Sequence, residues 1–153
     1  MLYYENNDIR AYGMCSHWIK YYRDLTYKQS YNLEFNEKTY FLNYLLRLKD
    51  LYMSKLRKED DPLAMKFYDG VVHIYYYFMD HPGYIPGIRQ NTNYCFNFQY
   101  LIERTESQLT GLLTRAESEF KSQNQHFAAF FLGQYFGSKE LIKICKIYLK
   151  SIC

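Results

Sequence analysis

Apolar residues recur at intervals of three and four along most of this chain, which is the period of an amphipathic α-helix. The longest stretch of this kind lies between residues 91 and 121. Its apolar side consists of Phe98, Leu101, Ile102, Leu109, Leu112, Leu113, Ala116 and Phe120. We therefore expect the central helix of the protein over about residues 92–110. It would continue to residue 121 unless Gly111 bends it.

Shorter periodic stretches predict three further helices. They cover residues 9–29, the segment from the expected cap Asn36 to Lys58, and residues 62–78. Asp61 followed by Pro62 is a helix-start signal, because aspartate can cap a helix and proline suits its first turn. The β-branched and aromatic residues near the end of the third segment would also suit a buried strand. No second stretch alternates in a way that would pair with it, so we expect a helix.

Glycine and proline mark the expected boundaries in the second half of the chain. Residues 81–87 contain two prolines and two glycines and should separate two helices. Residues 122–125 form a short polar link, and the apolar run 126–136 predicts a helix that is buried on most sides. We expect Gly137 to end that helix and Ser138 to cap the last one.

The composition is that of a single globular domain. The chain has 153 residues, of which 48% are hydrophobic and 23% charged. We predict an all-α protein with one domain over residues 1–153, a compact bundle of six to seven helices around the central helix. Neither a signal peptide nor a transmembrane anchor is predicted. We therefore expect an intracellular, cytoplasmic protein whose cysteines are free thiols.

Motifs for catalysis or metal binding are missing from the sequence. Cysteines and histidines lack the paired spacing of zinc sites, and no phosphate-binding loop or nucleophile elbow occurs. We expect no enzyme activity, no metal and no cofactor. A net charge of +3 is too mild for a dedicated nucleic-acid binder. A stripe of positive charge consists of Lys139, Lys143, Lys146 and Lys150. It is either a solvated helix face or a contact for a membrane, a nucleic acid or an acidic partner.

The order of the predicted elements resembles that of the B-cell-lymphoma-two (Bcl) family of apoptosis regulators, especially its divergent viral members. Residues 45–50, Leu-Leu-Arg-Leu-Lys-Asp, are similar to the family's third homology motif, in which aspartate follows leucine after five residues. Residues 93–94, Asn-Tyr, stand where its first homology motif has asparagine–tryptophan, and the helix from Ile9 matches its first helix. The glycine–arginine that follows in the family is replaced by residues 95–96, Cys-Phe, although Arg89 is nearby.

This resemblance implies an inhibitor of apoptosis that sequesters an amphipathic (BH3-type) helix of a pro-apoptotic protein in an apolar groove. The implied groove residues are Tyr44, Leu48, Leu51, Tyr52, Phe67, Val71, Ile74, Tyr75, Arg89, Asn93, Tyr94 and Phe98. Periodicity does not distinguish such a groove from plain bundle core. A helical scaffold or adaptor is the alternative, because residues 130–152 are similar to a tetratricopeptide helix pair. A small basic nucleic-acid-binding protein is a third reading, and a homodimer is compatible with the sequence.

Overall fold

Four long α-helices account for nearly all of the chain that the computed structural model describes, namely residues 10, 11, 13, 14, 38–79 and 94–152. They are α2 (Lys38–Lys58), α3 (Pro62–Met79), α4 (Tyr94–Lys121) and α5 (Gln125–Ile152). These ranges contain no β-strand, so the all-α prediction is confirmed, including a helix rather than a strand at residues 71–78. The predicted six to seven helices are not found in the part of the chain described.

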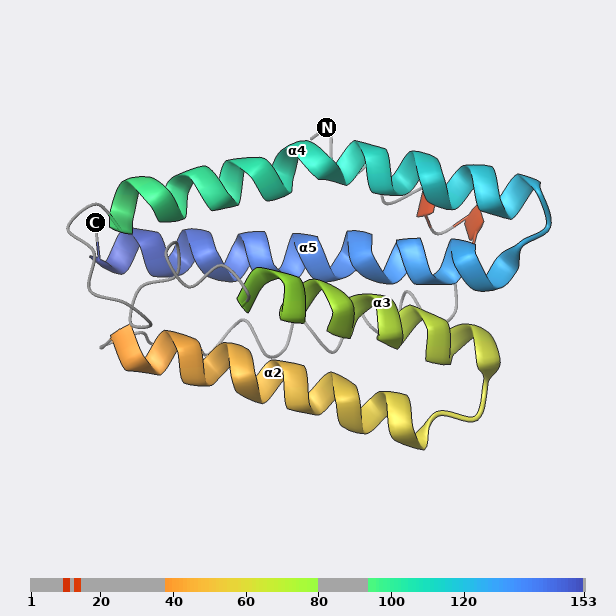
Figure 1. Cartoon of the computed structure of the whole chain (residues 1–153), viewed down its shortest axis with the longest axis horizontal. Coiled ribbons are helices and arrows are strands. Elements are labelled where there is room, and N and C mark those ends of the chain that lie inside the picture. Colours follow the sequence, from red (N-terminus) through yellow and green to blue (C-terminus); the bar gives the residue numbers. More distant parts are fainter. Residues whose placement is uncertain (1–9, 12, 15–37, 80–93, 153) are drawn as a thin grey trace.

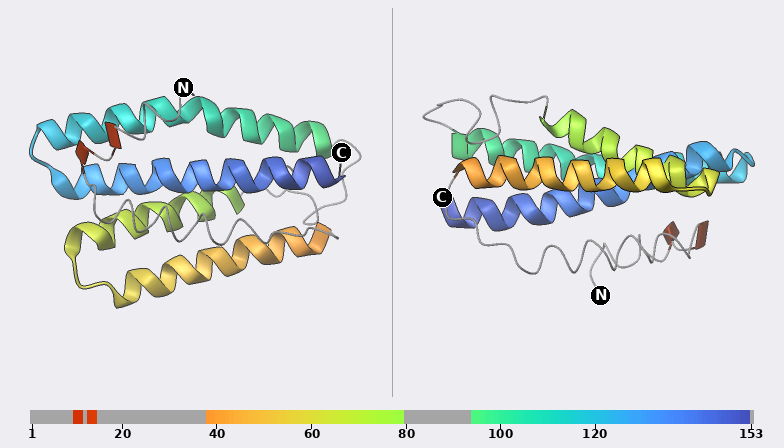
Figure 2. Two further views of the ribbon diagram at one scale, coloured as in Figure 1. Left: turned by 180° about the vertical axis from the view of Figure 1, so that it is seen from behind. Right: turned by 90° about the horizontal axis from the view of Figure 1, so that it is seen from below.

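The helices lie side by side in the order α4, α5, α3, α2, as the views from both sides show (Figures 1 and 2). The most extensive contacts join α5 to α3 and α5 to α4, whereas α2 packs mainly on α3. The prediction that residues 92–110 form the central helix is therefore wrong for the described helices, because α4 lies at one edge and α5 has extensive contacts with both of its neighbours (Figure 1). The physical reason is that α4 has a single apolar stripe, while α5 begins with an apolar run on nearly all sides.

Gly137, followed by Ser138, is the reason that α5 was predicted as two helices, and both Gly133 and Gly137 have a different role in the fold. Gly137 was expected to end a helix, but α5 continues through it, and residues 130–152 form no tetratricopeptide-like helix pair. A Cβ atom at Gly133 would collide with the carbonyl oxygen of Phe67, and one at Gly137 would lie 3.3 Å from the Cα of Val71. The missing side chains thus allow the backbones of α3 and α5 to approach closely.

A matching glycine on α3 completes this contact. A Cβ atom at Gly70 would collide with the carbonyl oxygen of Phe130 on α5. Gly111 in α4 differs, since a Cβ atom there would have nothing within 4 Å, and the helix runs through it without ending. The bend considered at Gly111 therefore does not divide α4 into two helices.

Capping residues set two of the helix ends. The Asp61 side chain accepts a hydrogen bond from the backbone N–H of Leu63 at 3.0 Å, which confirms the predicted cap of α3. At the end of α4, Gln123 has a φ of 62° and the N–H of Asn124 donates to the carbonyl oxygen of Glu119 at 2.8 Å. With the N–H of Gln123 donating to Phe120, this is a Schellman motif, which reverses the chain into α5.

Little of the predicted first helix, residues 9–29, falls within the described residues. Residues 10, 11, 13 and 14 are helical, and Ala11 is fully buried. The guanidinium of Arg10 pairs with the carboxylate of Glu117 on α4, with 2.5 Å between Nε and Oε1. This short piece therefore packs against α4.

Candidate functional site

The residues predicted to line a groove on α2 and α3 do come together, but in the interior of the bundle. Side chains with at most 2% of their surface exposed include Leu48, Tyr52, Phe67, Val71 and Tyr75. Tyr44 and Ile74 are partly buried and pack against the same core, and Leu51 is partly exposed. Their periodicity correctly marked the buried faces of two helices. It carried no information about whether another helix of the same chain covers those faces.

The remaining predicted groove residues contribute little to the described structure. Arg89 and Asn93 lie outside the described residues. Tyr94 and Phe98 belong to the first turns of α4, where the backbone is described but the side chains are not. The floor that the family resemblance implies therefore lies outside the described side chains.

A buried carboxyl group, which the sequence analysis missed, lies among the predicted groove residues. Only 6% of Glu140 on α5 is exposed. The hydroxyl of Tyr52 on α2 donates to its Oε2 atom at 2.7 Å, and the hydroxyl of Tyr75 on α3 donates to Oε1. Glu140 therefore links three helices. Its position four residues from both Phe136 and Ile144, on the apolar face of α5, is the sequence signal that could have revealed it.

Burial controls the protonation of this group. Loss of solvation raises the pKa of Glu140 to about 7, although the hydrogen bonds from Tyr75 and Tyr52 and the positive charge of Lys143 act in the opposite direction. Burial, and to a lesser extent the negative charge of Glu140, raises the pKa of Tyr44 to about 12. Near neutral pH the Glu140 carboxyl group is thus poised between its two protonation states. Glu140 does not line either of the two clefts between the helices.

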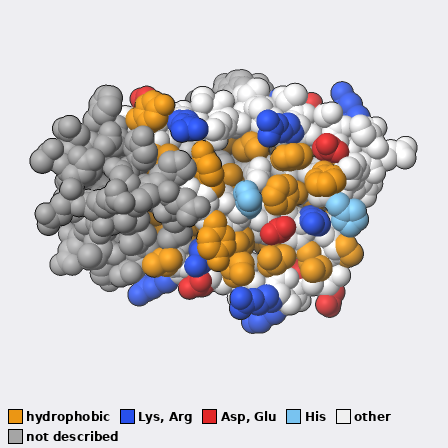
Figure 3. Space-filling view, viewed as in Figure 1, with side chains coloured by type: hydrophobic (Ala, Val, Ile, Leu, Met, Phe, Trp, Pro, Cys, Tyr) orange, Lys and Arg blue, Asp and Glu red, His pale blue; other side chains and the backbone are white. Residues whose placement is uncertain are grey.

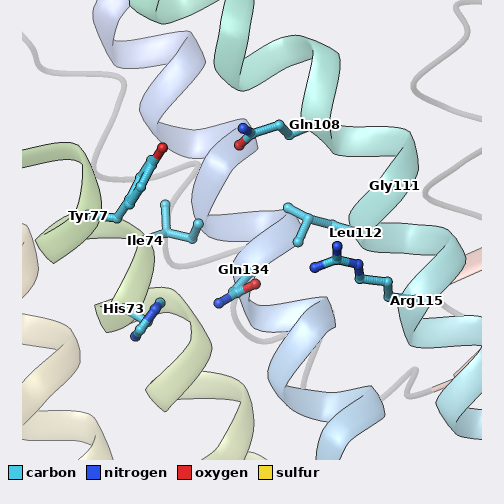
Figure 4. Close-up of a pocket in the computed structure, with 8 residues that line it drawn as sticks. All are labelled: His73, Ile74, Tyr77, Gln108, Gly111, Leu112, Arg115 and Gln134. Carbon is cyan, nitrogen blue, oxygen red and sulfur yellow. The ribbon is translucent and has the colours of Figure 1, made fainter.

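An open cleft of about 370 Å³ lies above α5 between α3 and α4 (Figure 4). Its lining residues come from all three helices: His73, Ile74, Tyr77, Gln108, Gly111, Leu112, Arg115 and Gln134. Figure 4 shows Gln134 rising from α5 between the two walls, with Arg115 reaching from α4 toward it. Only Ile74 among these residues was predicted as part of a site. The sequence analysis missed the others because the cleft is built largely from the polar sides of the helices.

The surroundings of this cleft combine aromatic surface with positive charge. The ring of His73 meets Phe130 edge-on with 5.6 Å between centroids, and the guanidinium of Arg115 lies 5.9 Å from the ring centroid of Phe131. Tyr77 is 39% exposed, and the neighbouring Tyr76 is 47% exposed. Hydrophobic side chains gather across the middle of the face seen in Figure 3. None of the lining residues is acidic, so the cleft favours a ligand with apolar and negatively charged groups.

The described residues also bear on metal binding, membrane insertion and thiol chemistry. Within the described ranges, no three histidine, cysteine or acidic side chains are close enough together to hold a metal ion, and no helix is long and apolar enough to cross a membrane. Cys145 is buried, and burial raises the pKa of its thiol, which makes it a poor nucleophile. Neither a protein-family model, nor a curated protein, nor a solved structure matches this chain.

Proposed function

We propose that this protein is a non-enzymatic interaction module that binds an amphipathic helix of a partner protein in the cleft between α3 and α4. The cleft itself supports the proposal, because walls from two helices and a floor from a third form a trough rather than a closed pocket. On α4 the lining residues run from Gln108 to Arg115 along one side of the helix. That distance corresponds to about 10 Å, or roughly two turns of a bound helix.

Gly111 gives the α4 wall its shape. It is exposed, and a Cβ atom there would meet nothing within 4 Å, so the wall is low between Gln108 and Arg115. A partner helix can approach closely at such a gap, as α3 and α5 do at their own glycines. Glycine in the middle of a helix is unfavourable by about 1 kcal/mol relative to alanine. An accessible cleft is a benefit that would offset this cost.

The charge of the residues that line the cleft limits which partner helices can bind there. Arg115 offers a guanidinium group at the cleft, and no lining residue opposes it with a negative charge. An arginine suits a carboxylate because its planar fork can form two parallel hydrogen bonds. We therefore propose a partner helix with apolar residues at three- and four-residue spacing and an aspartate or glutamate beside them.

The resemblance to the Bcl family supplies the first candidate, the BH3-type helix of a pro-apoptotic protein, whose aspartate pairs with an arginine in that family. In the present proposal Arg115 takes this role and the cleft between α3 and α4 replaces the groove first expected on α2 and α3. The scaffold alternative has lost its main support, since residues 130–152 form one helix rather than a repeat-like pair.

Fluorescence anisotropy with a panel of labelled BH3-type peptides tests the proposal. We expect at least one peptide to bind, and Gly111→Leu to weaken it more than tenfold by filling the cleft. Leucine is a better helix former than glycine, so this variant should remain folded. Gly111→Ala serves as the control, since a single methyl group leaves most of the cleft open.

A charge-swap arm makes the test specific. Arg115→Glu should weaken binding, and a peptide with lysine in place of its aspartate should recover it. The matched control Arg57→Glu, at an exposed position on α2, should have little effect. If no peptide in the panel binds, the apoptotic partner is refuted. If a peptide binds but Gly111→Leu does not affect it, the cleft between α3 and α4 is not the binding site.

A further inference from the structure

A second cleft, of about 290 Å³, lies between α4 and α5. Its lining residues are Leu109, Lys139, Ile142, Lys143 and Lys146. Leu109 is 2% exposed and Ile142 is 7% exposed, so they form an aliphatic floor. The three lysines stand around it on one side of α5. Their long aliphatic stems can extend the apolar surface while the ammonium groups reach the solvent.

Lysine is the only charged residue type among those that line this cleft. Lys146 Nζ lies 3.0 Å from the carboxylate of Glu106, and the ammonium group of Lys139 lies 5.5 Å from the ring centroid of Tyr135. Glu106 pairs with Lys146 and the buried Glu140 feels the charge of Lys143, but neither glutamate lines the cleft. The side chain of Lys146 is still 51% exposed, so the ion pair leaves it accessible to a ligand.

This second cleft is separate from the first. At 100° per residue, Lys139, Lys143 and Lys146 lie between about 120° and 180° around the axis of α5 from Gln134. Gln134 belongs to the cleft between α3 and α4, so the two clefts open on different sides of α5. A ligand in the cleft between α4 and α5 can therefore bind independently of the proposed partner helix.

We propose that the cleft between α4 and α5 binds the anionic headgroup of a membrane lipid, which would hold the protein at an anionic membrane surface. The lysine ammonium groups match the negative charge of the headgroup, and the aliphatic lysine stems and floor match its apolar methylene groups. A nucleic acid would place a charged backbone over that floor. It would also find no aromatic side chain among the lining residues on which bases could stack.

Vesicle co-sedimentation of the full chain tests this proposal. Vesicles of phosphatidylcholine alone are compared with vesicles that contain phosphatidylcholine and phosphatidylserine in equal amounts. Binding should require phosphatidylserine. It should also weaken strongly between about 0.1 M and about 1 M salt, because the screening length falls from about 10 Å to about 3 Å.

A pair of double variants separates this cleft from net charge. Each lysine near an anionic surface contributes about 1 kcal/mol, or roughly fivefold in affinity, so Lys143→Gln with Lys146→Gln should weaken binding about 25-fold. Lys66→Gln with Lys121→Gln removes the same charge from exposed positions elsewhere and should change binding less than about twofold. Circular dichroism of both double variants serves as the check that they are folded.

Comparison of the two double variants shows whether the cleft between α4 and α5 binds the lipid headgroup. A large loss confined to the Lys143 and Lys146 variant supports the proposal. Equal losses in both variants would reduce the effect to net charge and overturn it, as would binding to phosphatidylcholine alone or no binding to either vesicle. Tighter binding to a DNA or RNA duplex or to an acidic peptide than to phosphatidylserine vesicles would assign the cleft to that partner and also overturn the proposal.

Discussion

The close approach of α3 and α5 can be tested by adding one methyl group. A Cβ atom at Gly133 would collide with the Phe67 carbonyl oxygen and lie 3.2 Å from the Cα of Gly70. Both are backbone atoms, so no rotation of a side chain can relieve the contact. The two helices would have to move apart along their interface, which is the most extensive one between described helices. We therefore predict that Gly133→Ala destabilises the protein.

Two opposing terms set the magnitude. Alanine is favoured over glycine in a helix by about 1 kcal/mol. Overpacking a well-packed interior costs typically about 1–3 kcal/mol, and a collision with backbone belongs at the upper end. The expected net loss is about 2 kcal/mol in the free energy of unfolding. For a chain of this size, that corresponds to a fall of roughly 4–8 °C in Tm.

The free energy of unfolding is measured by urea denaturation, monitored by circular dichroism, with Gly111→Ala as the matched control. The control makes the same substitution inside α4, where the added Cβ atom meets nothing within 4 Å. It should therefore stabilise the protein by about 0.4–1 kcal/mol. The two substitutions should thus change the free energy of unfolding in opposite directions, with a difference of about 3 kcal/mol between the variants. Equal stabilisation by both substitutions would refute the close approach of the two helices.

Two further predictions concern Glu140 and the turn after α4. The unfolded chain releases the Glu140 proton near its ordinary pKa of 4.5, whereas the folded protein keeps it up to about pH 7. Stability should therefore fall by roughly 3 kcal/mol between about pH 5 and pH 8, and Glu140→Gln should abolish this fall. Parallel urea-unfolding profiles of the two proteins over that range would contradict the assignment. At Gln123, whose φ of 62° favours glycine, Gln123→Gly should raise the free energy of unfolding by about 0.5–1 kcal/mol, while no gain over Gln123→Ala in the same assay would argue against the Schellman turn.

Local patterns in the sequence determined the helices but not their neighbours. The period of apolar residues predicted α2, α3 and α4, and Asp61 before Pro62 predicted the start of α3. These features depend on residues a few positions apart, so the sequence carries them directly. The polar link at residues 122–125 was also correctly read as an interruption, with α5 beginning at its last residue.

The candidate site could not be predicted in the same way. Periodicity draws attention to apolar faces, and those of α2 and α3 became core because α2 packs on α3 and α5 covers α3. The cleft between α3 and α4 lies where less apolar sides of the helices face each other across α5, as with Gln108 and Arg115. Such a space is defined by the distance between helices far apart in sequence, and no local pattern records that distance.

Gly137 and Glu140 show this division most clearly. Read locally, glycine ends a helix and glutamate belongs on a solvated face. In the folded protein, Gly137 lies inside α5 because α3 packs closely against it, and Glu140 is buried because two tyrosines from α2 and α3 donate hydrogen bonds to it. The sequence by itself determined where α2, α3 and α4 form, since that depends on neighbouring residues. Only the tertiary structure decided which helix is central and which polar groups are buried, since both depend on contacts between distant segments.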